Sequence, residues 1–103
     1  MTLKLRNTWA YQGGDRWKWT AFIDDYGSGE LEEVKFVDYY LHESFPNPVR
    51  RVDTRDNGFE LSTGGWGTFE LEAFAHMKNG KKIRMRHGLK LEYEPRQGKS
   101  RGN

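Results

Sequence analysis

Three stretches of the chain alternate apolar and polar residues with a period of two, the pattern of β-strands that bury one face. They are residues 17–24, 69–77 and 83–91. Phe74 interrupts the alternation in the second stretch. Because a helix needs apolar residues every three or four positions, this spacing predicts three strands and a fold dominated by β-structure.

The dipeptide Asn79-Gly80 separates the second and third stretches and predicts a two-residue hairpin turn. Such a turn needs a positive φ at both central residues, which Asn and Gly tolerate better than other residues do. The implied register places Lys78 opposite Lys81. Two like charges facing each other should cost roughly a few tenths of a kcal/mol, a small penalty on this register.

Turn signals recur along the rest of the chain, as they do in a sandwich or a barrel. They fall at Gly13-Gly14, Gly27-Ser28-Gly29, Asn57-Gly58 and Gly64-Gly65. Residues 30–41 are ambiguous, because some apolar side chains stand at helical spacing while most residues are β-favouring types. We predict a strand there, since a lone helix would bury Asp38 without a partner.

The composition limits both the fold and the chemistry. With 103 residues, 35% of them hydrophobic, the chain predicts one domain whose core depends on its aromatic residues. We assign residues 1–94 to this domain and residues 95–103, which have nothing to bury, to a flexible tail or linker. The absence of cysteine excludes disulfides, a thiolate nucleophile and Cys-ligated zinc. No apolar run has the length of a signal peptide or a membrane span, so a soluble, cytoplasmic protein is expected.

Catalytic and metal-binding patterns are absent from the sequence. His42, His76 and His87 have none of the spacings that place two ligands on one helix face, so no metal is expected. Ser44 lies two residues from His42, but no nucleophile elbow surrounds it, and local hydrogen bonding explains the pair better than hydrolase chemistry does. The chain is therefore predicted not to be an enzyme and to need no cofactor.

A stripe of basic residues is the one sign of a nucleic-acid partner. The net charge of +2 is too small to indicate a nucleic-acid partner by itself, but four basic residues share one face of the third strand. They are Lys82, Arg84, Arg86 and Lys90. The stripe would suit phosphate contacts, or it is a solvated face whose lysines deter pairing at a sheet edge. We favour the second interpretation, and a DNA titration at low salt separates the two.

Two short segments have the composition of a recognition site. Residues 41–50 read Leu-His-Glu-Ser-Phe-Pro-Asn-Pro-Val-Arg, and residues 64–70 read Gly-Gly-Trp-Gly-Thr-Phe-Glu. Prolines hold Phe45 in an extended loop, and the glycines beside Trp66 leave that ring little to pack against. Both features favour the display of an aromatic ring over its burial.

This combination of loops closely resembles the YEATS domain family, and its prokaryotic branch in particular. The order and spacing of the other parts agree with the family over residues 3–93, from the first aromatic strand to the final hairpin. The resemblance implies an all-β fold, an immunoglobulin-like β-sandwich of about 7 to 8 antiparallel strands. It also implies that loops at one end of the sandwich read acylated lysine.

The resemblance assigns roles to four residues around the acyl amide. Phe45 and Trp66 would be two aromatic walls between which the flat amide stacks. Ser44 would hydrogen-bond the amide, and the backbone N–H of Trp66 would bond its carbonyl oxygen. His42 would orient Ser44 and line the wall. Such a slot suits the chemistry, because acylation turns a strongly hydrated ammonium into a neutral planar group with two π faces.

Four further residues complete the predicted site. Gly65, Gly67 and Thr68 would shape the channel through which the acyl tip passes. Trp17 is the nearest match to an aromatic that eukaryotic members supply just before the first aromatic strand. An acidic residue with which those members contact a histone peptide aligns with Gly88 here, which departs from the histone-reading pattern.

The implied partner is therefore an acylated lysine on an unknown client protein, with fusion to other domains as an option and no membrane partner. Two alternatives stay open. The first is a protein-interaction or scaffold sandwich of a prokaryotic signalling or conflict protein that binds no acyl group. The second is weak nucleic-acid binding by the basic stripe. A titration with acylated and unmodified peptides distinguishes acyl-lysine recognition from both alternatives.

Overall fold

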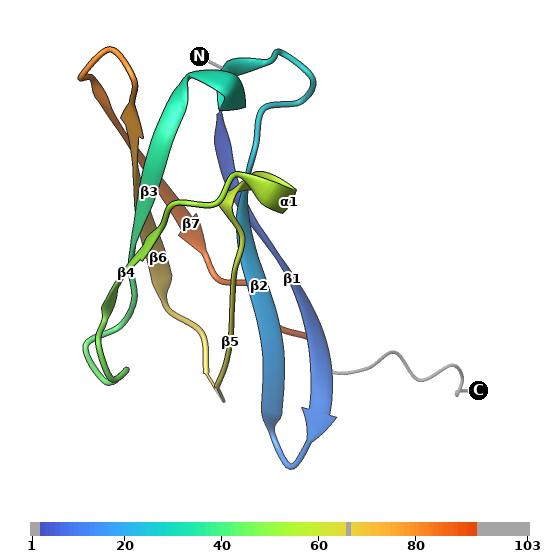
Figure 1. The fold of residues 1–103 in the computed structure, drawn as a ribbon. Helices are drawn as coiled ribbons and strands as arrows, with labels where there is room; N and C mark the ends of the chain where they lie inside the picture. Colours follow the sequence, from blue (N-terminus) through green and yellow to red (C-terminus); the bar gives the residue numbers. More distant parts are fainter. Residues whose placement is uncertain (1–2, 66, 93–103) are drawn as a thin grey trace.

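The computed structural model describes residues 3–65 and 67–92, and the predicted tail at 95–103 lies outside them. Two antiparallel sheets face each other across the core (Figure 1). The first sheet has the order β1-β2-β5, formed by β1 (Lys4–Gly13), β2 (Arg16–Asp24) and β5 (Leu61–Gly65). The second has the order β4-β3-β6-β7, formed by β4 (Val49–Val52), β3 (Val34–Tyr40), β6 (Glu70–Met77) and β7 (Lys82–Gly88). The predicted immunoglobulin-like β-sandwich is confirmed, with seven strands in the described part of the chain.

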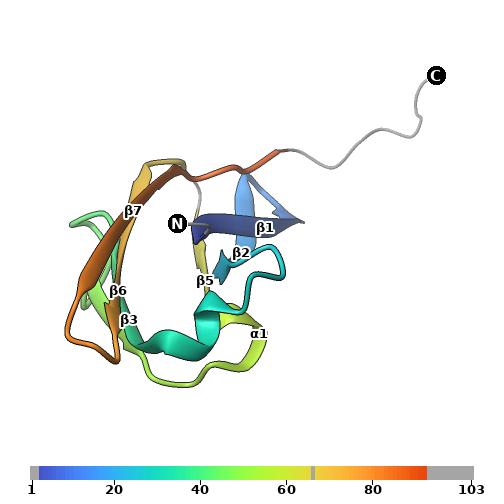
Figure 2. The same ribbon diagram turned by 90° about the horizontal axis from the view of Figure 1, so that it is seen from above.

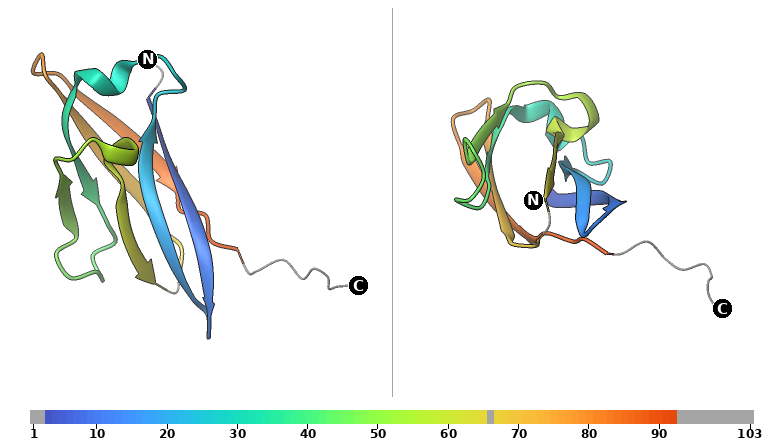
Figure 3. Two further views of the ribbon diagram at one scale, coloured as in Figure 1. Left: turned by 45° about the vertical axis from the view of Figure 1, so that its right-hand side comes forward. Right: turned by 90° about the horizontal axis from the view of Figure 1, so that it is seen from below.

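Two of the three periodic stretches match the structure closely, and the third is shorter than predicted. Residues 17–24 and 69–77 correspond to β2 and β6, with alternating buried and more exposed side chains. Strand β7 ends at Gly88 because the chain then crosses toward β1 (Figure 3). There the Asn7 side chain accepts the N–H of Lys90 at 3.0 Å and donates to its C=O at 2.8 Å. These two bonds take the place of strand pairing.

The prediction of a strand over residues 30–41 is wrong for its first four residues and for its last, Leu41. Glu30–Glu33 form a 3₁₀ helix, η1, and the strand begins at Val34. The Asp25 carboxylate accepts the backbone N–H groups of Gly27, Gly29 and Leu31 at 3.0 to 3.2 Å, which folds the chain back on itself before the strand. These backbone bonds also hold the pKa of the Asp25 carboxyl below its ordinary value.

The hairpin between β6 and β7 has a three-residue loop in place of the predicted two-residue turn. Met77 donates its N–H to the C=O of Lys81 at 2.8 Å, and His76 is paired with Lys82. The predicted register is therefore wrong, and Lys78 lies within the turn. The extra loop residue lets the Asn79 side chain accept the N–H of Lys81 at 2.9 Å, while Gly80 adopts a φ of +91°. It also avoids a cross-strand pair of two lysines.

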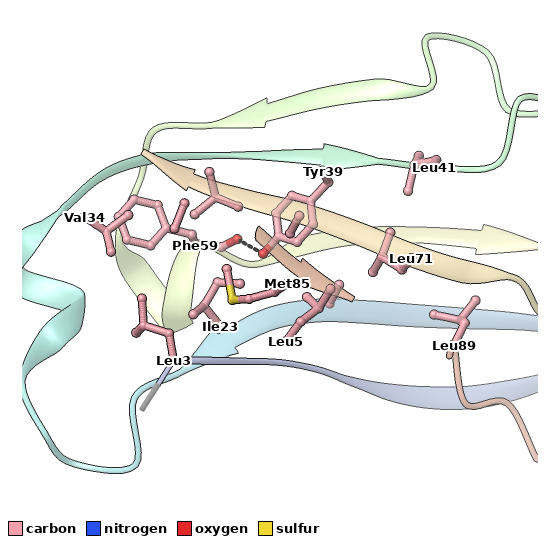
Figure 4. Close-up of a cluster of buried hydrophobic side chains, with 14 of the residues drawn as sticks. Leu3, Leu5, Ile23, Val34, Tyr39, Leu41, Phe59, Leu71, Met85 and Leu89 are labelled. Carbon is pink, nitrogen blue, oxygen red and sulfur yellow. Dashed lines mark hydrogen bonds between the residues drawn. The ribbon is translucent and has the colours of Figure 1, made fainter. Parts of the chain in front are cut away.

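The core side chains lie between the two sheets, whose arrangement is seen from above in Figure 2. Its largest fully buried side chains are Trp19, Tyr39, Phe59, Ile23, Leu71 and Val37. Tyr39 keeps its polar atom satisfied by donating its hydroxyl to the C=O of Phe59 at 2.6 Å (Figure 4). Burial also raises the pKa of Tyr39 far above its ordinary value. This bond joins β3 to the short helix α1 (Asp56–Phe59), which lies in the connection from β4 in one sheet to β5 in the other.

A buried carboxylate sits on the outer face of the four-stranded sheet. Asp38 is only 7% exposed and accepts two hydrogen bonds from the Arg51 guanidinium, at 2.8 and 3.2 Å. The Nε2 of His76 lies 3.2 Å from the same carboxylate, and Phe36 stacks on the His76 ring at 4.3 Å. The hydrogen bond from Arg51 is the main cause that holds the pKa of the Asp38 carboxyl below its ordinary value.

Replacing Asp38 by asparagine should therefore cost more stability at neutral pH than at acid pH. A carboxyl whose folded pKa is depressed stabilises the fold above its unfolded pKa of about 3.9, and this contribution disappears as the pH falls through the folded value. We expect Asp38→Asn to lose about 1.5 to 3 kcal/mol at pH 7, the worth of hydrogen bonds to a charged group. Urea unfolding between pH 3 and 7 should show the difference from wild type shrinking below about pH 4.

A matched control for this variant is Asp24→Asn. Asp24 pairs with Arg6 at 2.7 Å on a more exposed surface, where an ion pair is worth less than about 1 kcal/mol. A wild-type to Asp38→Asn difference that stays constant from pH 7 to pH 3 would contradict the assignment.

Candidate functional site

The connections between β3 and β4 and between β5 and β6 lie at the same end of the sandwich (Figure 1). Between them is a cavity of about 450 Å³. Small-molecule sites commonly enclose about 300 to 1,000 Å³, so the cavity has room for a side chain of a partner. The described residues that line it are His42, Ser44, Phe45, Pro46, Gly64, Gly65, Gly67, Thr68 and Phe69.

The loop between β3 and β4 is closed at its base and folded at its tip by backbone hydrogen bonds. Leu41 donates its N–H to the C=O of Pro48 at 2.7 Å, and Phe45 donates to the C=O of His42 at 3.0 Å. Asn47 adopts a left-handed conformation with φ +51°, which Asn tolerates better than most residues. The result is a compact loop that carries Phe45 toward the cavity.

The hydrogen bonds between His42 and Ser44 define what the serine can offer a ligand. The Nδ1 atom of His42 accepts the backbone N–H of Ser44 at 3.1 Å, which assigns the proton of the neutral ring to Nε2. The Ser44 Oγ lies 2.9 Å from the same Nδ1 and is therefore the donor of that bond. Its lone pairs then remain available, so Ser44 presents a hydrogen-bond acceptor.

Aromatic rings form one side of the cavity. Phe45 packs against Phe69 at a centroid distance of 5.5 Å and an angle of 59°. Behind both lies Trp19, only 1% exposed, with edge-on contacts at 6.4 Å to Phe45 and 6.0 Å to Phe69. His42 is tilted against Phe69 at 6.1 Å. The Phe45 ring is therefore held in place by contacts with two other aromatic rings, those of Trp19 and Phe69.

Glycines form the opposite side, on β5 and the loop that follows it. A Cβ atom added to Gly65 would lie 3.7 Å from the Cζ atom of Phe45, so the ring tip reaches across to β5. A Cβ atom added to Gly67 would meet nothing within 4 Å. Glycine at both positions keeps the wall thin and leaves the space beside Phe45 open.

Six of the eight residues predicted for the site line this one cavity, and they are His42, Ser44, Phe45, Gly65, Gly67 and Thr68. Trp66 lies outside the described residues, so its predicted position opposite Phe45 stays a prediction. Trp17 is not among the described lining residues. It is 6% exposed, packs against Tyr11 at 5.1 Å and donates its Nε1–H to the C=O of Glu92 at 2.8 Å.

Three lining residues belong to the two segments with the composition of a recognition site but have no predicted binding role, namely Pro46, Gly64 and Phe69. The only structural role predicted for Phe69 is on the apolar face of a strand. It precedes β6 at the very end of the sheet, where an inward-facing ring reaches the loops as well as the core. The sequence signal that could have identified Phe69 as a site residue is its position at the junction of the glycine loop and the strand.

The described lining of the cavity contains no Lys, Arg, Asp or Glu. Within the described ranges, no group of three or more His, Asp or Glu side chains could hold a metal ion. The site is therefore an uncharged aromatic pocket with a few polar atoms.

Neither η1 nor α1, the two helices in residues 3–65 and 67–92, has the length or apolar content to cross a membrane.

Two of the four residues in the predicted basic stripe are matched by acidic residues of β6. Arg84 donates to the Glu72 carboxylate at 2.7 Å, and Arg86 lies 3.7 Å from that of Glu70. Lys82 lies over the Phe74 ring at 5.3 Å. This pairing favours the interpretation of the stripe as a solvated outer face, because cations already paired with carboxylates attract phosphates weakly.

Comparison with known proteins identifies relatives of this chain. The prokaryotic YEATS domain family model matches residues 17–90. The AF-9 homolog of Kluyveromyces lactis is 38% identical over 77 residues, which cover 71% of this chain and 34% of that protein. The transcription initiation factor TFIID subunit 14b of Arabidopsis thaliana is 32% identical over 85 residues, covering 79% of this chain and 31% of that protein. The chain thus spans about a third of the length of these curated relatives.

A solved structure supports the same relationship. The structure of the Yaf9 YEATS domain recognizing an H3K122suc peptide has a TM-score of 0.72 and 26% sequence identity to this chain. The match covers 88% of this chain and 71% of that one.

Proposed function

We propose that this chain, which belongs to the prokaryotic YEATS domain family, binds an acylated lysine side chain in the cavity at the end of its sandwich. The observation that carries the proposal is the Ser44 hydroxyl, which offers acceptor lone pairs beside the Phe45 ring. An acyl-lysine amide has one N–H to donate and two π faces to cover. Ser44 accepts the N–H, and Phe45 covers one face.

The second wall in this proposal is Trp66. It was predicted from the family resemblance and lies outside the described residues. The proposal therefore rests on the described side of the site, which Phe45 and Phe69 form together. The flat amide and any conjugated acyl group gain aromatic contact there, so crotonyl should bind at least as well as acetyl.

Unmodified lysine is a poor ligand for such a cavity. Its ammonium would lose several kcal/mol of hydration on entering an apolar site, unless a paired charge replaced that hydration. The described lining residues include no carboxylate that could do so. We therefore propose that binding depends on the acyl group and that the role of the domain is recognition, not catalysis. The client is an acylated lysine in a protein segment whose sequence is left open.

A titration of the protein with matched peptides tests the proposal directly. Acetyl-lysine, crotonyl-lysine and unmodified versions of one peptide should be compared by calorimetry and by NMR. We expect saturable binding of the acylated versions, with shift changes at residues 42–45 and 67–69, and no saturation with the unmodified peptide. An equal response to all three peptides, or no response at all, would refute acyl-lysine reading. The second result is what a scaffold role predicts.

Replacing Ser44 with alanine should weaken binding of the acylated peptide about tenfold, because the amide N–H loses its acceptor at a cost near 1.4 kcal/mol. The matched control is Ser62→Ala. Ser62 lies on the outer face of β5, where its Oγ is 2.8 Å from the Oγ1 of Thr20. Isothermal titration of both variants measures the difference. Equal affinity in Ser44→Ala and wild type would remove Ser44 from the proposed site.

A further inference from the structure

Arg50 links β4 to the loop that carries Phe45. It is paired with Tyr39 on the inner side of β4 and is half-buried. Its Nε donates to the C=O of Asn47 at 2.7 Å, and its Nη2 donates to the C=O of Pro46 at 2.8 Å. One planar guanidinium therefore holds two consecutive carbonyl groups of the loop.

The loop has few other means of holding this stretch in place. Pro46 and Pro48 have no backbone N–H to donate, and Asn47 has a φ of +51°. The bond from Leu41 to Pro48 closes the base of the loop, and the bond from Phe45 to His42 closes its tip. The Arg50 bonds hold the residues between these two closures, Pro46 and Asn47, which directly follow Phe45 in the chain.

We propose that Arg50 is a positioning residue for the binding cavity. By fixing the carbonyls that follow Phe45, it holds that ring against Trp19 and Phe69 and so sets the affinity for the ligand. This inference rests on the proposed function. A lysine at position 50 would keep the charge, but its single ammonium lacks the rigid fork that reaches both carbonyls.

The test compares Arg50→Lys with Arg51→Lys. The second variant makes the same exchange on the opposite face of β4, where the arginine also donates two hydrogen bonds, to Asp38. Affinity is measured with a crotonyl-lysine peptide. Hydrogen exchange of the Phe45 and Leu41 amides is measured without ligand, because it reports loop order independently of binding.

We expect Arg50→Lys to bind roughly tenfold more weakly, which corresponds to the loss of about one net hydrogen bond. Exchange at the Phe45 amide should become faster, while Arg51→Lys keeps wild-type affinity and loop exchange. If Arg50→Lys unfolds, Arg50→Gln, which retains an amide donor, should show the same loss.

Two results would overturn the inference in distinguishable ways. If the wild type binds the crotonyl peptide and Arg50→Lys binds it equally well, the positioning role is refuted and the proposed function stands. If the wild type binds no acylated peptide, the proposed function fails, and the inference that depends on it fails with it.

Discussion

Replacing Phe45 with alanine is expected to weaken binding of a crotonyl-lysine peptide by about 100-fold, the effect of removing a central aromatic anchor worth near 2.8 kcal/mol. The ring lines the cavity and is braced from behind by Trp19 and Phe69. Its loss removes the aromatic surface on which the amide stacks and widens the cavity. Calorimetric titration at a temperature where circular dichroism shows the variant folded gives the affinity.

Two companion variants separate binding from general stability. Phe45→Leu keeps apolar volume but loses the flat π face, so it should bind less tightly than wild type and more tightly than Phe45→Ala. Phe74→Ala removes a ring on the outer face, where Phe74 packs against Tyr40 at 5.3 Å, and should leave affinity unchanged. Wild-type affinity in Phe45→Ala would contradict the proposed role of the ring.

The strands that could be predicted from sequence are those whose pattern is local. Strands β2 and β6 alternate apolar and polar residues, with Phe74 as the one exception in β6, because each puts one face on the core and the other toward solvent. The Asn-Gly signal at residues 57–58 also marked a sharp change of chain direction: both residues have positive φ, within the segment that forms α1. Local side-chain chemistry was sufficient in these cases.

The errors arose where individual side-chain hydrogen bonds decide where a strand begins or ends. The 3₁₀ helix η1 depends on the Asp25 carboxylate, which binds backbone groups up to six residues later. The end of β7 depends on Asn7, which bonds to Lys90 from the other end of the chain. The first interaction is local and the second joins residues 83 positions apart, but apolar periodicity detects neither, so it extended both strands too far.

The candidate site was more predictable than those boundaries, because most of it comes from two short segments. Residues 42–45 meet through bonds between near neighbours, and the glycines of the second loop need no side-chain contacts to shape the cavity. Trp17 was harder to place. Its spacing in β2 is the same whether the ring faces a ligand or the core, and only the packing on Tyr11 and the bond to Glu92 distinguish the two.

The backbone of the short helix α1 packs against β2 one residue before that strand ends at Asp24. Gly58 has a φ of +73°, and a Cβ atom added there would lie closer than 3.0 Å to the carbonyl oxygen of Ile23. The next residue, Phe59, is 1% exposed and accepts the Tyr39 hydroxyl with its C=O. Any displacement of α1 would therefore also disturb a buried side chain and a buried hydrogen bond.

Replacing Gly58 with alanine is accordingly expected to destabilise the fold by more than about 3 kcal/mol, a large fraction of the roughly 5 to 15 kcal/mol that holds a small domain folded. The methyl group cannot be accommodated by a rotamer change, because the atom it meets is a backbone carbonyl oxygen of β2. Thermal unfolding should show a loss of at least about 12 °C. Gly80→Ala is the control, since Gly80 has a φ of +91° but nothing within 4 Å of its added Cβ atom. That variant pays only the left-handed strain of about 1 to 2 kcal/mol, so a Gly58→Ala loss no larger than the Gly80→Ala loss would show that α1 moves away from β2 at little cost.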